Sequence, residues 1–249
     1  MNLSLAYELR VPRPVRRVSA FGMMAAVAVL SGCAGVSGVS PTSPTVVSSA
    51  QGISRQPLAL SSQVGAPANK GSCTGQNLIQ DGDFETPVVP MGGYTGFDSG
   101  SALGPWTVIG PYGDGVALLS SSLSEDGYTY NAQSGVQSLD LTVPPNGPAG
   151  VQQTVYLEAN HAYNLCFWVG NIHDPKTIFG RRSTVIVMVN GQQILEAKNA
   201  RGTAGSGVVV WKQFKTTFSV PGGATTISFN NGDPVNDNYN GLDSVELVF

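Results

Sequence analysis

The sequence predicts an all-β domain, built as a sandwich or jelly roll of antiparallel strands. Short runs of β-branched and aromatic residues recur along residues 73–249, and turns containing glycine or proline separate them. Asn190-Gly191 joins two such runs and is a dipeptide that favours a two-residue type I′ hairpin. No window combines a sustained helical period of apolar residues with capping residues at its ends.

The strand prediction is strongest in the second half of the chain. In the last run, Val245, Leu247 and Phe249 alternate with more polar neighbours, as expected for a strand with one buried face. Pro221-Gly222-Gly223 supplies a turn between two further runs. We expect strands, in chain order, over residues 151–157, 184–189, 192–195, 211–220, 225–230 and 242–249.

The segment N-L-I-Q-D-G-D-F-E at residues 77–85 resembles the opening N-L-I-x-N-G-x-F-E of galactose-binding-like β-sandwiches. That group includes carbohydrate-binding modules of bacterial glycanases and a plant cell-wall protein family of undefined function. The resemblance covers residues 75–249, and it implies a jelly-roll sandwich whose first and last segments lie side by side. Further segments follow in family order: G-P-W at 104–106, Q-S-L-D-L at 137–141, G-V-Q-Q-T-V at 150–155, Y-N-L-C-F at 163–167 and N-G-L-D-S-V-E-L at 240–247.

Residues 1–32 have the features of an export signal. Arginines, including Arg16 and Arg17, precede an apolar run over residues 20–30 that is shorter than the roughly 20 residues of a membrane span. Leu30-Ser31-Gly32-Cys33 resembles the lipobox of bacterial lipoproteins, which implies cleavage before Cys33 and diacylation of its thiol. Ala34 after that cysteine implies sorting to the outer membrane. An ordinary secretory signal with an incidental cysteine is the alternative.

Composition separates a linker from the folded domain. Residues 33–72, the lipidated linker in this interpretation, hold mostly small and polar residues and few aromatic or charged ones, so we expect a flexible tether. Residues 73–249 suffice for one well-buried domain. They carry seven lysines and arginines against fifteen aspartates and glutamates, a net charge of −8. A field of that sign repels phosphate backbones and argues against nucleic acid as a partner.

Two cysteines remain in the predicted domain, Cys73 and Cys166. An even pair in an exported protein suggests a disulfide. Cys166 lies within an apolar run, so a buried free thiol is the alternative.

The acidic residues near the start of the domain raise the question of a metal. Asp81, Asp83 and Glu85 occupy alternate positions, which on an extended backbone would point all three carboxylates to one side. In the resembled modules a structural Ca²⁺ lies between a glutamate of the first strand and an aspartate of the last strand. Those positions correspond to Glu85 and Asp243, whereas Asp83 stands where the family varies. Carboxylates that merely cap the sheet or face solvent are the alternative.

Aromatic and amide residues gather in segments predicted to be loops. Because sugars present flat apolar faces edged by hydroxyl groups, a glycan site combines aromatic rings with amide and carboxylate groups. The first candidates are three tyrosines with two polar partners, and solvated loop tips are the alternative: Tyr128, Tyr130, Tyr239, Asp237 and Asn238.

Catalysis finds little support in the sequence. His161 and His173 are the only side chains with an ordinary pKa near neutrality, and no G-x-S-x-G nucleophile motif occurs. We therefore expect a non-catalytic, lipid-anchored surface protein that binds a glycan or cell-envelope polysaccharide. The alternative is a structural or protein-interaction module of the envelope without a sugar site.

Overall fold

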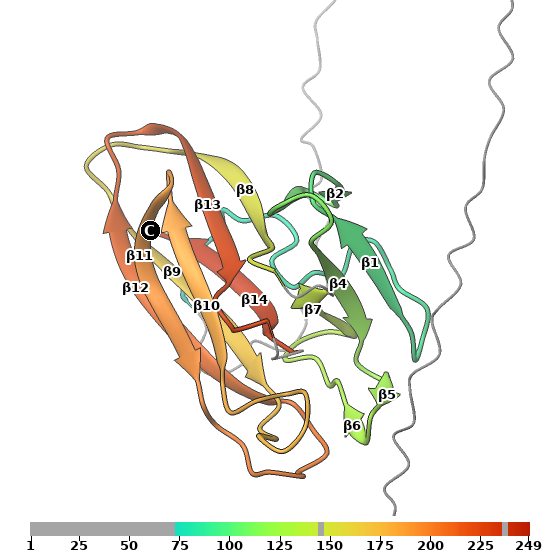
Figure 1. Cartoon of the computed structure of the whole chain (residues 1–249). Coiled ribbons are helices and arrows are strands. Elements are labelled where there is room, and N and C mark those ends of the chain that lie inside the picture. The colour runs from blue at the N-terminus through green and yellow to red at the C-terminus, as the bar shows by residue number, and fades with distance from the viewer. Residues whose placement is uncertain (1–72, 144–146, 236–238) are drawn as a thin grey trace, which may run out of the picture. The chain divides into compact units, whose positions relative to one another are not determined.

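The computed structural model describes residues 73–143, 147–235 and 239–249, which form β-strands and no helix (Figure 1). Cys33, Asp237 and Asn238 lie outside the described residues, as do the predicted signal and linker. The strands are β1 Tyr94–Asp98, β2 Ala102–Leu103, β3 Trp106–Ile109, β4 Gly115–Ser120, β5 Ser124–Glu125, β6 Tyr128–Thr129, β7 Gln137–Val143, β8 Gly150–Leu157, β9 Ala162–Asn171, β10 Ser183–Val189, β11 Gln192–Asn199, β12 Val210–Ser219, β13 Gly223–Asn231 and β14 Gly241–Val248.

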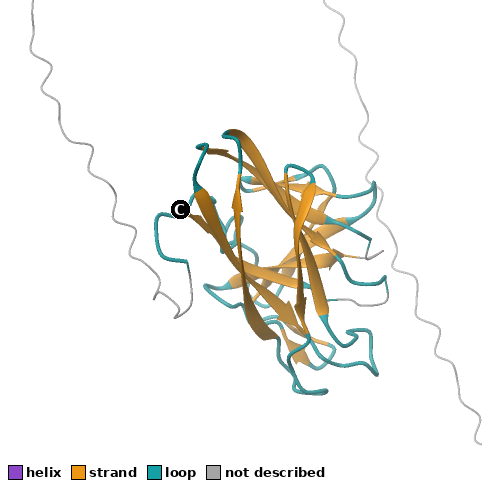
Figure 2. Cartoon of the chain, turned by 90° about the vertical axis from the view of Figure 1, so that its left-hand side faces the viewer, coloured by secondary structure: helices purple, strands orange, loops and turns teal. Residues whose placement is uncertain are grey.

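Two six-stranded antiparallel sheets form a jelly-roll sandwich, which confirms the predicted fold class. The first sheet has the order β1-β4-β7-β14-β9-β12, and the second has the order β11-β10-β13-β8-β3-β2. The strands lie in two layers (Figure 2), while β5 and β6 pair with each other as a short hairpin outside both sheets.

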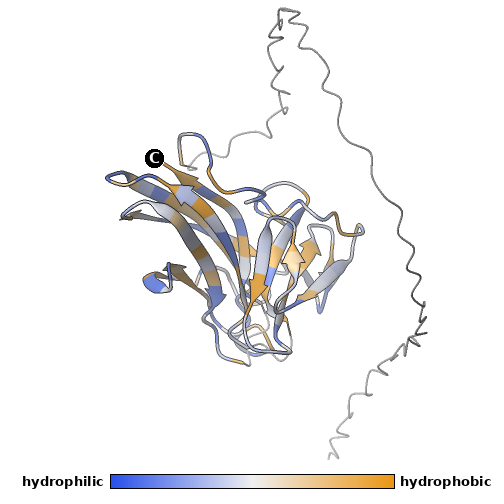
Figure 3. Cartoon of the chain, turned by 90° about the horizontal axis from the view of Figure 1, so that it is seen from above, coloured by the Kyte–Doolittle hydropathy of each residue, from blue (hydrophilic) through white to orange (hydrophobic). Residues whose placement is uncertain are grey.

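The main core fills the space between the two sheets. Trp106 is buried, with its ring 5.3 Å from that of Phe84 and 6.1 Å from that of Phe229. Phe167 of the first sheet lies 5.1 Å from the same Phe229 of the second. Apolar and polar residues alternate along many strands (Figure 3), as expected when one face of each sheet packs inward.

The first and last segments of the domain lie side by side, as predicted. Leu78 donates its backbone N–H to the carbonyl of Leu247 at 2.8 Å. The Asn77 side chain bonds both ways to β14, because its Nδ2 donates to the Val245 carbonyl and its Oδ1 accepts from the Leu247 N–H. These bonds hold the entry of the chain along a central strand of the first sheet.

A disulfide joins Cys73 to Cys166 on β9, so the bridge is present and the free thiol is not. The Cys73 backbone N–H also donates to Glu246 Oε2 on β14, at 2.8 Å. Because the two cysteines are 93 residues apart, the chain-entropy model assigns the bridge a stabilisation of about 4–5 kcal/mol.

Two details of the predicted backbone were wrong. The segment containing Asp81 and Glu85 is not an extended strand but a turn, with φ of 48° at Asp81 and 54° at Phe84. The cause is close packing, because a Cβ at Gly82 would lie 2.0 Å from the Val245 carbonyl oxygen. The strand after the Asn190-Gly191 turn also runs on to Asn199, since it remains paired with β10 over that length.

In the part of the chain that the structure describes, no helix has the length and apolar character to span a bilayer.

Candidate functional site

The first sheet carries a pocket on its outer face, which is turned away from the second sheet. We call it the β4–β7 pocket, because Ala117 and Leu119 of β4 and Asp140 and Thr142 of β7 form its floor. Its volume is about 240 Å³, close to the lower end of small-molecule clefts at about 300 Å³. The exposed Tyr94 of β1 borders it.

β4 can contribute to the pocket floor because other residues cover both of its faces. Every residue of β4 is buried. Val116 and Leu118 point into the core between the sheets, whereas Ala117 and Leu119 belong to a second apolar cluster on the outer face. Successive side chains of a strand point to opposite faces, so this uninterrupted burial requires two separate layers of cover.

The β5–β6 hairpin supplies one wall of the pocket. Asp126 and Gly127 form its two-residue turn with φ of 53° and 82°, the left-handed pair that a type I′ turn requires. This turn places the exposed Glu125 and Asp126 at the rim, while the following Tyr130 contributes to the wall.

The loop between β9 and β10 supplies the opposite wall through the exposed Ile178 and the buried Phe179. Phe179 packs edge-on against Tyr128 of the hairpin, with 4.9 Å between ring centroids. The Tyr128 hydroxyl donates to Asp174 Oδ2 at 2.5 Å, and this bond raises the pKa of the phenol. The two walls are therefore fixed to each other.

Negative charge dominates the pocket. Burial raises the pKa of Asp140 to about 6, although the Asn240 N–H and the Thr142 N–H and hydroxyl all donate to its Oδ1 and favour the ionised form. Burial also raises the pKa of Tyr130 well above its ordinary value. The charges of Asp140, Asp126 and Glu125 raise it further, so all three carboxylates act on one phenol.

The tyrosines predicted as exposed loop contacts are buried instead. Tyr128, Tyr130 and Tyr239 are 5%, 7% and 0% exposed, and they form part of the cluster that covers the outer face of the first sheet. Tyr130 packs edge-on against Tyr239 at 5.4 Å between ring centroids. The prediction was wrong about exposure because it took loops to be solvated, whereas these segments shield an apolar sheet face. Only Tyr130 of the three lines the pocket.

Several pocket residues were not predicted. Asp126-Gly127 carries the type I′ turn signature, so it could have placed Glu125 and Asp126 at an exposed tip. Tyr94 and Ile178, which are 60% and 45% exposed, carry no comparable local pattern. They come to line the same pocket only because the fold brings β1 and the β9–β10 loop to the same face of the first sheet.

Four carboxylates lie near the meeting point of the two ends of the domain, where the charge of Asp83 acts on the other three, and we call them the chain-end carboxylates: Asp81, Asp83, Glu85 and Asp243. Asp243 is 0% exposed, and burial raises its pKa well above the ordinary value. Its Oδ2 accepts from the N–H groups of Gln133 and Ser134, at 2.9 and 3.1 Å.

The Glu85 carboxylate also accepts hydrogen bonds from this segment, at residues that follow Gln133 and Ser134. Its Oε1 accepts from the N–H groups of Val136 and Gln137, at 2.8 and 3.2 Å. Between these anchors stands Gly135, whose φ is 62° and where a Cβ would lie 2.0 Å from Glu85 Oε1. Residues 133–137, which connect the pocket wall to β7, therefore depend on two carboxylates.

Among the residues that the structure describes, no lysine, arginine or histidine forms an ion pair with the chain-end carboxylates. Burial raises the pKa of Asp81 to about 6 and also raises the pKa of Glu85 and Asp243, and the charge of Asp83 raises all three further. Asp81 Oδ2 is buried without a hydrogen-bond partner. Within the described residues, no three histidine, cysteine, aspartate or glutamate side chains converge as a metal cluster. The group thus fits a hard cation only with backbone carbonyls as further ligands.

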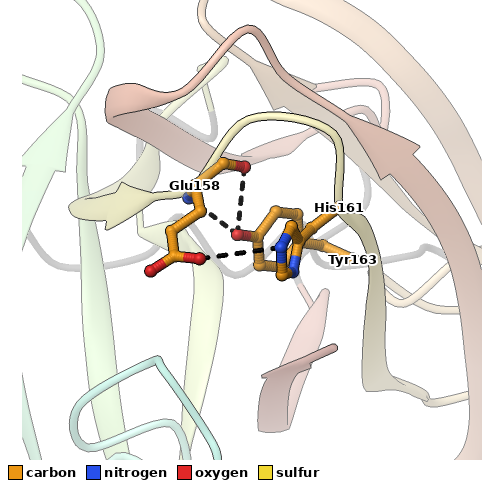
Figure 4. Close-up of polar contacts among 3 residues, drawn as sticks. All are labelled: Glu158, His161 and Tyr163. Carbon is orange, nitrogen blue, oxygen red and sulfur yellow. Dashed lines mark hydrogen bonds and ion pairs between the residues drawn. The ribbon is translucent and has the colours of Figure 1, made fainter.

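The two histidines have structural contacts away from the pocket. His161 Nε2 lies 3.6 Å from Glu158 Oε2 at the β8–β9 turn, where the Tyr163 hydroxyl accepts from the Glu158 N–H and donates to the Glu158 carbonyl (Figure 4). His173 Nδ1 lies 3.0 Å from the Arg181 carbonyl oxygen.

A second hollow of about 310 Å³ lies beside β8. The side-chain amide of its buried Gln153 forms two hydrogen bonds with the backbone of Gln80. Nε2 donates to the Gln80 carbonyl at 3.0 Å, and Oε1 accepts from the Gln80 N–H at 2.9 Å. It offers the exposed Tyr156 but no ionised side chain among its described lining, so we favour the β4–β7 pocket as the candidate site.

No protein-family model and no curated protein sequence matches this chain. Its structural neighbours include carbohydrate-binding modules. A family 61 module in complex with β-1,4-galactotriose is 17% identical, with a TM-score of 0.43 over 69% of this chain and 97% of that chain. The xylan-binding family 22 module of a Paenibacillus barcinonensis protein is 14% identical, with a TM-score of 0.38 over 65% and 97%.

An enzyme is also among the neighbours. An isomalto-dextranase of Arthrobacter globiformis, complexed with panose, is 16% identical with a TM-score of 0.39, over 64% of this chain and 24% of that chain. Likeness of this degree does not define a function.

The buried carboxyl of Asp140 predicts a pH dependence of folding. Its pKa of about 6 in the folded protein exceeds the ordinary 3.8, so the folded state binds the proton more tightly and stability falls as pH rises through 6. Between pH 8 and pH 5 this group should add about 1.4 kcal/mol to the free energy of unfolding. Asp140→Asn should remove that increment in urea titrations at both pH values.

The matched control is Asp98→Asn, which replaces an exposed carboxylate at the far end of β1. It should retain the wild-type difference between the two pH values. An Asp140→Asn protein with an undiminished difference would contradict the assignment of the titration to the pocket.

Proposed function

We propose that this protein is a non-catalytic glycan-binding module, exported and held at the membrane by lipid, whose ligand occupies the β4–β7 pocket. The observation that carries the proposal is the combination in one pocket of an exposed ring, apolar side chains on the floor and several carboxylates. Tyr94 can pack against the apolar face of a sugar, since aromatic side chains bind such faces at the edge of a cleft. Glu125, Asp126 and Asp140 can accept hydrogen bonds from its hydroxyl groups.

Binding without catalysis follows from how the polar groups are used. Asp140 has the raised pKa of a general acid, but its Oδ1 already accepts three hydrogen bonds. Two come from Thr142 on the same strand, and the third, from the Asn240 N–H, fixes β7 to the residue before β14. Glu125 and Asp126 lie at an exposed rim, where their carboxylates are surrounded by solvent rather than held in an enclosed catalytic geometry.

We also propose a structural Ca²⁺ held by Glu85 and Asp243, with Asp83 nearby and backbone carbonyls completing the coordination. The support is electrostatic, because burial and the charge of Asp83 raise the pKa of Asp81, Glu85 and Asp243, and Asp81 leaves a buried oxygen without a partner. A bound divalent cation would supply the missing positive charge. It would also stabilise residues 133–137, which lead directly from the pocket wall to β7.

Lipid anchoring at Cys33 remains a proposal from the sequence alone. Two acyl chains on one cysteine contribute about 0.8 kcal/mol for each buried CH₂ group, which suffices for stable anchoring. The protein would then be displayed at the outer membrane, facing glycans of the envelope or of its surroundings.

The glycan proposal predicts saturable binding that depends on Tyr94. On a glycan array, the full-length protein in detergent should bind defined oligosaccharides. Tyr94→Ala should weaken the affinity for them about tenfold, because it removes an aromatic contact worth about 1–1.5 kcal/mol. Tyr112→Ala, which removes a fully exposed ring outside the pocket lining, should bind as the wild type does. An absence of glycan binding would favour the protein-interaction alternative.

The calcium proposal predicts a melting temperature that falls when EDTA replaces Ca²⁺. Ligand at 100 times its Kd stabilises a fold by about 2.7 kcal/mol, so the shift should amount to several degrees. Glu85→Gln and Asp243→Asn should each abolish the difference between the two conditions. Coincident melting curves of the wild-type protein with and without the cation would refute the site.

The lipid proposal predicts that radiolabelled palmitate is incorporated into the wild-type protein expressed in a bacterial host. Cys33→Ala should remove the label and leave an uncleaved precursor. Label retained in that variant would place the modification elsewhere, and a processed but unlabelled wild type would support the ordinary secretory signal.

A further inference from the structure

The charge of the β4–β7 pocket is one-sided. Glu125, Asp126 and Asp140 line it, and no lysine, arginine or histidine stands among the described residues of its lining. Ion pairs in the described chain join Glu158 to His161 and Glu196 to Lys198, so they leave the three pocket carboxylates without a cation.

The neighbouring basic residues do not supply the missing charge. Lys176, Arg181 and Arg182 lie in the same β9–β10 loop as Ile178, but none of the three lines the pocket. Arg182 acts instead on Asp233, whose pKa its charge lowers against the effect of burial.

One tyrosine that lines the pocket has a hydroxyl group without a hydrogen-bond partner among the described residues. Tyr130 is 7% exposed and lines the cavity. Its side chain packs on Tyr239, but within the described residues its hydroxyl forms no hydrogen bond. The phenol lies within range of the three carboxylates, which raise its pKa. A ligand donor placed there would meet one neutral oxygen and three negative groups.

We propose that the pocket selects glycans whose sugar units carry a free, protonated amine. This inference rests on the proposed glycan-binding function and specifies its ligand class. An ammonium group donates hydrogen bonds and carries the positive charge that the carboxylates lack, and charge-assisted bonds of this kind are stronger than those to a hydroxyl group. Uronate-containing glycans would meet like charge in the same place, so the pocket should reject them.

Three β-1,4-linked tetrasaccharides test the inference, because the units of glucosamine, N-acetylglucosamine and glucose differ only at C2. In calorimetric titrations of the full-length protein in detergent at pH 6.5, the glucosamine tetramer should bind at least tenfold more tightly than the other two. Raising the salt concentration should reduce this preference, since the rim charges are exposed to solvent.

The double variant Glu125→Gln with Asp126→Asn should lose the preference, so that the three tetramers bind with similar affinity. Asparagine tolerates the left-handed φ of residue 126, so the hairpin is retained. The matched control is Glu158→Gln, an exposed carboxylate of the β8–β9 turn at the other end of the sandwich (Figure 1). It should keep the preference, which separates the pocket from the net negative charge of the domain.

The outcomes distinguish this inference from the proposed function. Equal affinity of the wild type for all three tetramers overturns the amine selectivity while glycan binding stands. A preference that survives in the double variant, or that Glu158→Gln also removes, assigns it to the general charge of the protein and overturns the pocket assignment. Failure of every tetramer and every array glycan to bind overturns the proposed function and this inference together.

Discussion

The apolar outer face of β4 is the constraint on which the candidate site depends. A sandwich needs apolar side chains only between its sheets, yet β4 carries Ala117 and Leu119 outward as well as Val116 and Leu118 inward. Burying that second face is favourable at about 25 cal/mol per Å² of apolar surface. The hairpin and the β9–β10 loop provide the cover, and they leave a pocket where they do not meet. The candidate site is thus the part of this sheet face that the hairpin and the β9–β10 loop leave uncovered.

A few side chains likewise determine how the two ends of the domain meet. Asn77 and Leu78 fix the entry segment along β14, which brings Asp81 and Glu85 towards Asp243. The carboxylates then accept hydrogen bonds from backbone groups of residues 133–137. One group of side chains therefore joins the first segment, the last strand and the connection to the pocket floor. Burial of so much negative charge has a free-energy cost, which is visible in the raised pKa values.

The sequence allowed the sandwich to be predicted, because alternation and turn residues are local properties. Asn190-Gly191 and the alternation around Val245 each specify structure within a few residues. The site depends instead on which distant segments share a sheet face. Tyr128 and Tyr239 were predicted as exposed loop residues, and nothing in the local sequence indicates that they cover a sheet in which β4 has apolar side chains on both faces. Asp81 was misplaced for the same reason, since its turn follows from contact with a strand more than 160 residues later.

The bridge between Cys73 and Cys166 also has a mechanical consequence. Cys73 is the point at which the preceding chain enters the folded domain, and its sulfur is bonded to β9, a strand flanked by β14 and β12. A pull on the N-terminal stretch is therefore delivered through a covalent link to the interior of a sheet. The load falls on two flanking ladders at once rather than peeling an edge strand away one hydrogen bond at a time. A domain attached in this way resists extension from its N-terminal side even when the pocket at its other end is engaged.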